Sequence, residues 1–126
     1  MQSKRILIID DEESIQKVVS LSLKMEAGWD IITASSGLEG IRQAEAYRPD
    51  AILLDVMMPE TDGISTFESL NNNPQTQSIP VILLTAKTRT AEKRLFQKIG
   101  VVGVITKPFN PLTLASRMAK LLNWSL

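Results

Sequence analysis

The sequence of 126 residues predicts a doubly wound α/β domain, (βα)5, built around a five-stranded parallel sheet. Five short aliphatic runs alternate with five stretches of helical periodicity, and turn-forming residues separate them. The runs are apolar throughout, as is typical of strands covered by helices on both faces. The composition, 44% hydrophobic and 22% charged, suits one globular domain over residues 1–126, with no output domain expected.

The first predicted strand, residues 4–10, leads into a helix over residues 12–27. Asp10 or Asp11 is expected to cap this helix, because acidic side chains favour helix N-termini, and Gly28 ends it. Apolar residues at helical spacing predict its buried face: Ile15, Val18, Val19 and Leu23.

The second predicted strand covers residues 30–34, and Ser36 is expected to cap the helix that follows. This helix ends before Pro49, because proline and the residue preceding it disfavour helical geometry. Its predicted inner side comprises Leu38, Ile41, Ala44 and Ala46 or Tyr47.

The third strand, residues 51–55, precedes a helix that starts at Asp62-Gly63 and buries Ile64, Phe67 and Leu70. A fourth strand is predicted over residues 79–85, with Pro80 tolerated at its start. The helix expected next, residues 89–99, ends at Gly100 and turns these residues inward: Ala91, Leu95, Phe96 and Ile99.

The fifth strand covers residues 101–106, and Pro111 is expected in the first turn of the last helix. Trp124 is predicted to lie at the edge of the core. The apolar side of this helix is read as Leu112, Leu114, Ala115, Met118, Leu121 and Leu122.

The chain contains neither cysteine nor histidine, which excludes disulfides, Cys or His metal sites, and Ser-His-Asp or Cys-His catalysis. The lack of cysteine and of any long apolar run predicts a cytoplasmic protein without a membrane segment. Residues 1–84 carry 6 Lys/Arg and 13 Asp/Glu (net −7), whereas residues 85–126 carry 8 and 1 (net +7). This split indicates either an acidic pocket opposite a basic docking surface, or a polar surface whose charges merely segregate.

Polar groups follow four of the five predicted strands, at the sheet edge where doubly wound folds place their functional groups. The second strand lacks such a group, which favours the strand order 2-1-3-4-5 with that strand outermost. Three or more carboxylates in one pocket repel one another unless positive charge compensates their negative charge. A divalent cation bound by the carboxylate oxygens, together with a lysine, would supply that positive charge. Taken singly, each group could instead be a helix cap, a turn residue or a surface charge. The groups are Asp10, Asp11 and Glu12, then Asp55, Thr85 and Lys107.

This set resembles the receiver domain of two-component response regulators, and the resemblance covers the whole chain. It implies a flavodoxin-like fold, in which the cis bond of the family falls at Lys107-Pro108. The matching segments are Asp10-Asp11, Asp55 with Met57-Met58-Pro59 and Gly63, Thr85-Ala86, and Lys107-Pro108-Phe109.

By this resemblance, Asp55 is the phosphoryl acceptor, and Thr85 and Lys107 contact the phosphoryl oxygens. Mg²⁺ is implied as the cofactor, with Mn²⁺ as an acceptable substitute. Its expected ligands are Asp10, Asp11, Asp55 and the backbone carbonyl of Met57. The implied donor is a phosphohistidine on a sensor histidine kinase or a histidine phosphotransfer protein.

The resemblance also implies a signalling domain rather than an enzyme, one that assists only its own phosphorylation and dephosphorylation. A protein partner is expected on the fourth helix, fifth strand and fifth helix, a face that would also suit a homodimer. Val104 stands where the family has an aromatic residue, which puts ring-based signalling in doubt. Neither nucleic acid nor a membrane is an expected direct partner. The basic residues of that face are Lys87, Arg89, Lys93, Arg94, Lys98, Arg117 and Lys120.

Two other functions fit these residues less well. A phosphatase of the haloacid dehalogenase type would use Asp10 as nucleophile, but Glu12 stands where its second aspartate belongs. Such enzymes also want acidic metal ligands after the lysine, and no Asp or Glu follows Glu92. A nucleotide-binding domain would need a glycine-rich phosphate loop after the first strand, and none is present.

Overall fold

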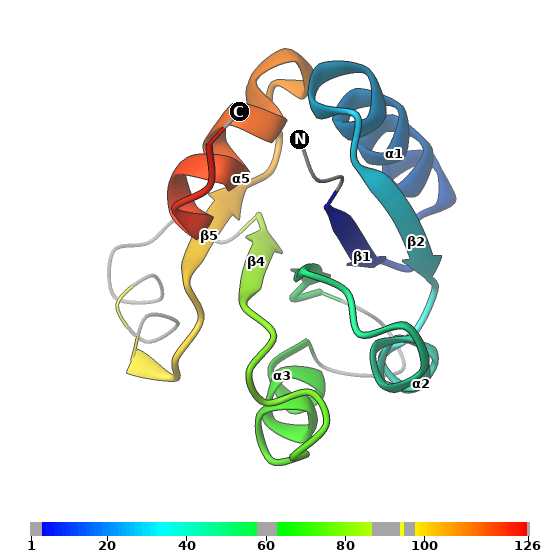
Figure 1. The fold of residues 1–126 in the computed structure, drawn as a ribbon, viewed down its shortest axis with the longest axis vertical. Coiled ribbons are helices and arrows are strands. Elements are labelled where there is room, and N and C mark those ends of the chain that lie inside the picture. Colours follow the sequence, from blue (N-terminus) through cyan, green and yellow to red (C-terminus); the bar gives the residue numbers. More distant parts are fainter. Residues whose placement is uncertain (1–3, 58–62, 87–93, 95–97, 126) are drawn as a thin grey trace.

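The computed structural model describes residues 4–57, 63–86, 94 and 98–125. Five parallel strands form one sheet in the order β2-β1-β3-β4-β5, so the predicted fold and strand order are confirmed (Figure 1). The strands are β1 (Arg5–Ile9), β2 (Asp30–Ala34), β3 (Ala51–Asp55), β4 (Val81–Thr85) and β5 (Gly103–Thr106).

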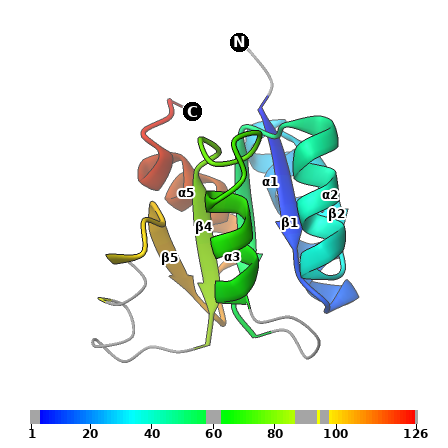
Figure 2. The same ribbon diagram turned by 90° about the horizontal axis from the view of Figure 1, so that it is seen from below.

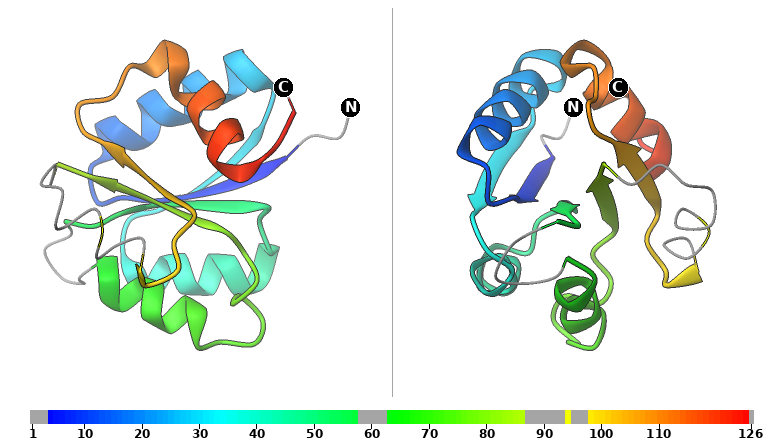
Figure 3. Two further views of the ribbon diagram at one scale, coloured as in Figure 1. Left: turned by 90° about the vertical axis from the view of Figure 1, so that its left-hand side faces the viewer. Right: turned by 180° about the vertical axis from the view of Figure 1, so that it is seen from behind.

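Helices cover both faces of the sheet (Figure 3). One face carries α1 (Glu13–Ala27) and α5 (Leu114–Leu122), the latter preceded by a short 3₁₀ helix, η1 (Pro111–Thr113). The other carries α2 (Gly37–Tyr47) and α3 (Gly63–Asn71), which lie side by side in Figure 2. The helix predicted over residues 89–99 lies mostly outside the described residues, as do its proposed core positions Ala91, Leu95 and Phe96.

Alternation along the strands divides the core into two layers. Successive side chains of a strand point to opposite faces, so that Ile6 and Ile8 face α1 and α5 while Leu7 and Ile9 face α2 and α3. β3 and β4 follow the same rule, and all five residues of each are buried. Burial on both faces explains why these strands are apolar throughout.

Several local predictions are confirmed. Gly28 adopts a left-handed conformation, with φ 68°, and ends α1, and the Ser36 side chain accepts a hydrogen bond from the Glu39 N–H at the start of α2. Pro111 occupies the first turn of η1, and the Lys107-Pro108 bond is cis. Trp124 is half-buried and packs edge-to-face on Trp29, with ring centroids 5.4 Å apart.

Other predictions about α1 are wrong. Val18 is 42% exposed, whereas the polar Gln16 and Ser22 are buried beside Val19 and Leu23. Both polar side chains donate hydrogen bonds to backbone carbonyls, which removes the penalty of burying them. Neither Asp10 nor Asp11 is the N-cap residue, because that position is Glu12, whose side chain makes no capping bond.

The inner faces of α2 and α5 also differ from expectation. Leu38 is exposed, and so are Ala46 and Tyr47, because α2 approaches the sheet through its small residues Gly37, Gly40 and Ala44. A Cβ atom on Gly40 would lie 2.4 Å from Ile9 Cδ1, so a larger residue there would require the Ile9 side chain or α2 to shift. In the C-terminal segment, Leu112 and Leu121 are exposed, whereas the remaining predicted positions are buried or half-buried.

Gly63 holds the start of α3 directly against the end of β3. A Cβ atom there would lie 2.4 Å from the Asp55 backbone oxygen and 2.6 Å from Val56 Cα, two backbone atoms that cannot rotate away. We expect Gly63→Ala to lower the free energy of unfolding by about 1–3 kcal/mol, the usual range for overpacking. Urea denaturation measures this, with the exposed Ser65→Ala in the same helix as control. A loss no larger than that of the control would contradict the close-approach explanation.

Candidate functional site

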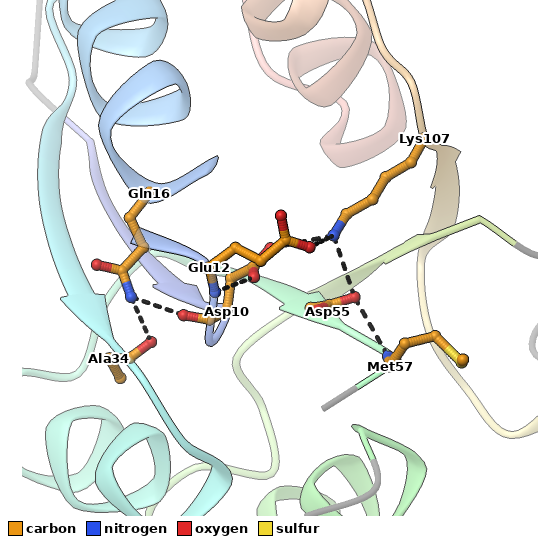
Figure 4. A network of polar contacts seen from close by, with 7 residues as sticks. All are labelled: Asp10, Glu12, Gln16, Ala34, Asp55, Met57 and Lys107. Atoms are coloured by element: carbon orange, nitrogen blue, oxygen red, sulfur yellow. Dashed lines mark hydrogen bonds and ion pairs between the residues drawn. The ribbon is translucent and has the colours of Figure 1, made fainter. Parts of the chain in front are cut away.

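Three strands bring charged groups to one edge of the sheet, as the sequence predicts (Figure 4). Asp10 directly follows β1, Asp55 is the last residue of β3, and Lys107 follows β5. β1 and β3 are neighbours, so the two aspartates lie close together at adjacent strand ends. β4 lies between β3 and β5, and Lys107 reaches the carboxylates with its long side chain.

Asp10 is fully buried, and both of its carboxylate oxygens have partners. Oδ1 accepts a hydrogen bond of 2.9 Å from the Glu12 N–H, and Oδ2 lies 3.4 Å from Lys107 Nζ. Burial raises the pKa of this carboxyl above its ordinary value, although the Glu12 N–H and the charge of Lys107 oppose that change. Lys107 and the Glu12 N–H therefore compensate part of the negative charge of the Asp10 carboxylate.

Asp55 is only 1% exposed, and its two oxygens differ. Oδ1 accepts a hydrogen bond of 3.2 Å from the Met57 N–H and lies 3.5 Å from Lys107 Nζ. Oδ2 is buried and has no hydrogen-bond partner within the described part of the chain. Burial, followed by the negative charge of Asp10, raises the pKa of Asp55 to about 6 against the opposing effects of Met57 and Lys107. Buried polar atoms almost always have a hydrogen-bond partner, so this oxygen is a candidate to bind a ligand.

Lys107 is the cation of the site. Its ammonium nitrogen lies 3.4 Å from Asp10, 3.5 Å from Asp55 and 3.7 Å from Glu12, and the side chain is 18% exposed. Burial alone would lower the pKa of this lysine, but the charges of Asp10 and Asp55 outweigh it and raise the pKa instead. Lys107 is therefore protonated and stays charged between the two buried carboxylates.

The donor set fits a hard divalent cation. Asp10, Asp11 and Asp55 each offer an oxygen, and these oxygens lie within 4.8 Å of one another. Asp11 is exposed while the other two are buried, so the cluster opens to solvent on one side, where waters can complete the coordination of Mg²⁺. Asp55 Oδ2 gives independent support, since no other described residue forms a hydrogen bond to it and it is available to a cation. The proposed role of the Met57 carbonyl stays a prediction.

Thr85 and Val104 lie where the sequence places them. Thr85 is fully buried at the end of β4, the strand next to Asp55, and its contact with a phosphoryl group stays a prediction. Val104 is half-buried on β5 beside Leu83, and packs against the core layer under α2 and α3.

Two contacts at the site were not predicted from the sequence. Glu12 was expected among the strand-end carboxylates, but its contact with Lys107 was not foreseen. Gln16 was overlooked altogether, because a polar residue at a helical core position carries no signal of its own. Its side chain reaches the backbone of Asp10, as described below.

The predicted basic face is described only in part. Arg94, Lys98, Arg117 and Lys120 are all exposed, in agreement with a surface role. Lys87, Arg89 and Lys93 lie outside the described residues. No helix in the described part of the chain has both the length and the apolar character needed to span a bilayer.

Comparison with known proteins agrees with this geometry. The alkaline phosphatase synthesis transcriptional regulatory protein PhoP of Bacillus subtilis is 40% identical over 123 residues, which are 98% of this chain and 50% of PhoP. The phosphate regulon transcriptional regulatory protein PhoB of Pseudomonas aeruginosa is 39% identical, over 97% of this chain and 53% of PhoB. The chain thus spans about half the length of the curated relatives it matches.

A solved structure of the chemotaxis response regulator CheY4 of Vibrio cholerae superposes with a TM-score of 0.87 at 32% identity. The superposition covers 95% of this chain and 99% of CheY4. The family model of the response regulator receiver domain matches residues 6–119, a span that includes each charged group of the site. The chain therefore belongs to the response regulator receiver domain family of two-component signalling proteins.

Proposed function

We propose that Asp55 accepts a phosphoryl group from a phosphohistidine of a sensor histidine kinase or a histidine phosphotransfer protein. The observation that carries the proposal is the buried Oδ2 of Asp55, which has no hydrogen-bond partner among the described residues. The Asp55 carboxylate lies beside Lys107 and two further aspartates. Phosphorylation on aspartate is the family property, and this aspartate ends a strand at the centre of the site. A phosphohistidine donor must lie outside residues 1–126, since this sequence contains no histidine.

The transfer forms a bond between an Asp55 oxygen and phosphorus while the bond from phosphorus to the donor's imidazole nitrogen breaks. An aspartate carboxylate can act as this nucleophile without further activation. Lys107, already within 3.5 Å of Asp55, is placed to neutralise charge on the transferring group, and Thr85 on the neighbouring strand is the proposed second contact. Catalysis by positioning and charge neutralisation is what phosphoryl transfer requires.

A bound Mg²⁺ would neutralise negative charge on the phosphoryl oxygens and the carboxylates. Asp10, Asp11 and Asp55 would hold it, together with the Met57 carbonyl and waters. Mn²⁺ would substitute, because carboxylate and carbonyl ligands suit both ions.

The two aspartates are not equivalent as nucleophiles. Both oxygens of Asp10 are engaged, one by the Glu12 N–H and one by Lys107. One oxygen of Asp55, in contrast, has no partner within the part of the chain that the structure describes. This favours Asp55 over Asp10 and therefore the signalling domain over a phosphatase that attacks through Asp10.

Residues 1–126 are proposed to work as one receiver unit in the cytoplasm and to signal through protein contacts rather than through nucleic acid. Arg117 and Lys120 on α5, with Arg94 and Lys98, provide exposed positive charge for a protein partner or a second copy of the chain. Half-buried Val104 offers no aromatic ring to such a switch, so the partner would read a change of backbone or charge instead.

The test is to incubate the protein with a small phosphodonor and Mg²⁺ and to record its intact mass. One added phosphoryl group is expected, and its loss on treatment with hydroxylamine would identify an acyl phosphate. Chelating the metal is expected to slow incorporation strongly, because the clustered carboxylates then repel the donor. No incorporation with Mg²⁺, or steady turnover of an external phosphomonoester, would overturn the proposal.

A further inference from the structure

Helix α1 sends a buried amide side chain to the acidic loop, defined as residues 10–12. Gln16 is 9% exposed, and its Nε2 donates a hydrogen bond of 2.6 Å to the backbone oxygen of Asp10 (Figure 4). The same nitrogen lies 3.3 Å from the oxygen of Ala34, the last residue of β2, and 3.1 Å from Oγ of Ser35, which follows it. One amide thus joins the acidic loop, α1 and the segment after β2.

The carbonyl that Gln16 holds belongs to the peptide bond between Asp10 and Asp11. A peptide group is planar, so fixing its oxygen also fixes the direction of the Asp11 N–H and the position of Asp11 Cα. The Asp10 N–H donates to the Ala34 oxygen at 3.0 Å, so that Asp10 is held on both sides of its Cα. Gln16 therefore controls the orientation of the link between two of the three clustered carboxylates.

The position of the Asp11 carboxylate depends on this peptide link more than the positions of the Asp10 and Asp55 carboxylates do. Asp10 and Asp55 are buried and held by several contacts, whereas the Asp11 side chain is exposed. An exposed carboxylate receives little guidance from packing, so its distance to the other two follows from the backbone that carries it. Groups that orient metal ligands from outside the coordination sphere typically change affinity by about 10–100-fold when removed.

We propose that Gln16 is a positioning residue for the divalent-cation site, acting through the Asp10–Asp11 peptide. This inference rests on the proposed function, since it assumes that Asp10, Asp11 and Asp55 hold the cation. Gln16 itself touches neither the cation nor the phosphoryl group. Its role is to keep the two neighbouring aspartates aimed at one point when no metal is bound.

The test measures Mg²⁺ affinity by calorimetry in the full chain carrying Gln16→Met, which keeps the length of the side chain but removes its donors. We expect the dissociation constant to rise about tenfold, the lower end of the usual range. The phosphorylation rate at saturating Mg²⁺ is expected to return to the wild-type value. Ser22→Ala is the matched control, because Ser22 is equally buried on α1 and donates to a backbone carbonyl, that of Pro111, away from the acidic loop. It should lower the melting temperature and leave the Mg²⁺ affinity unchanged.

An unchanged Mg²⁺ affinity in Gln16→Met, with a melting temperature lowered as in Ser22→Ala, would overturn the inference and leave the proposed function intact. Failure of the wild type to bind Mg²⁺ would instead overturn both. If Gln16→Met does not fold, an NMR titration of the wild type with Mg²⁺ tests the same inference. The side-chain amide resonances of Gln16 are expected to shift as Mg²⁺ saturates the protein, and resonances that do not move would contradict the inference.

Discussion

Asp55→Asn is expected to abolish phosphoryl incorporation completely. The amide lacks the negative charge and the nucleophilic lone pair of the carboxylate, while its size leaves the surrounding strand ends in place. Intact mass after incubation with a small phosphodonor and Mg²⁺ measures the effect. The wild type should gain one phosphoryl group, and the variant none at any donor concentration that saturates the wild type.

Asp50→Asn is the matched control for this experiment. Asp55 is the last residue of β3, whereas Asp50 directly precedes the strand. Asp50 lies exposed at this opposite end, where it accepts a hydrogen bond from the Arg5 N–H. Its variant should be phosphorylated like the wild type. Phosphoryl incorporation that persists in Asp55→Asn at the wild-type level would show that another residue is the acceptor. Asp10→Asn would then be the next variant to test.

The architecture was predictable because its strands are buried on both faces. Residues 51–55 and 81–85 are wholly buried, and their unbroken apolar runs stand out from the amphipathic helices on either side. The strand order followed from chemistry, since four charged or polar strand ends had to share one edge, and the structure confirms it. The observed strand boundaries differ from the predicted ones by no more than two residues, because the ends of the apolar runs determine where the strands end.

The errors arise where helix orientation depends on what lies beneath the helix. Val18, Leu38 and Leu112 have the spacing of core residues, yet each is exposed. Periodicity identifies an apolar stripe, but the contact face is decided by how closely the helix can approach the sheet and by which polar groups find partners there. Gly40 against Ile9, and Gln16 against the Asp10 carbonyl, are contacts that no spacing rule contains.

The same distinction applies to the site. Asp10, Asp55 and Lys107 are fixed by strand ends, so their convergence follows from topology, and their mutual distances confirm it. Glu12 and Gln16 belong to a loop and to a helix, and their contacts depend on local backbone geometry. Sequence reasoning therefore identified the charged groups that topology brings together. It listed Glu12 without its contact to Lys107, and it missed Gln16.

The charge of Asp55 should make the metal-free protein less stable as the pH rises from about 4 to 7. The folded-state pKa of about 6 lies above the ordinary value of 3.8, so folding favours the protonated carboxyl. Below about pH 4 the group is neutral in both states. Above pH 6 it is ionised in both, and the folded state then bears the unfavourable burial. At 1.36 kcal/mol per pH unit, the difference corresponds to about 3 kcal/mol.

Comparing Asp55→Asn with the wild type isolates this effect from the other carboxyl groups. Urea denaturation in the presence of a chelator should give equal free energies of unfolding near pH 4. At pH 7 the variant should be more stable by up to about 3 kcal/mol, since its side chain cannot ionise. Saturating Mg²⁺ should then narrow the gap by stabilising the wild type alone, because a ligand that binds only the folded state adds to its stability. A difference that is the same at both pH values would show that Asp55 ionises normally in the folded chain, and a gap that Mg²⁺ leaves unchanged would show that this carboxylate is not among the cation's ligands.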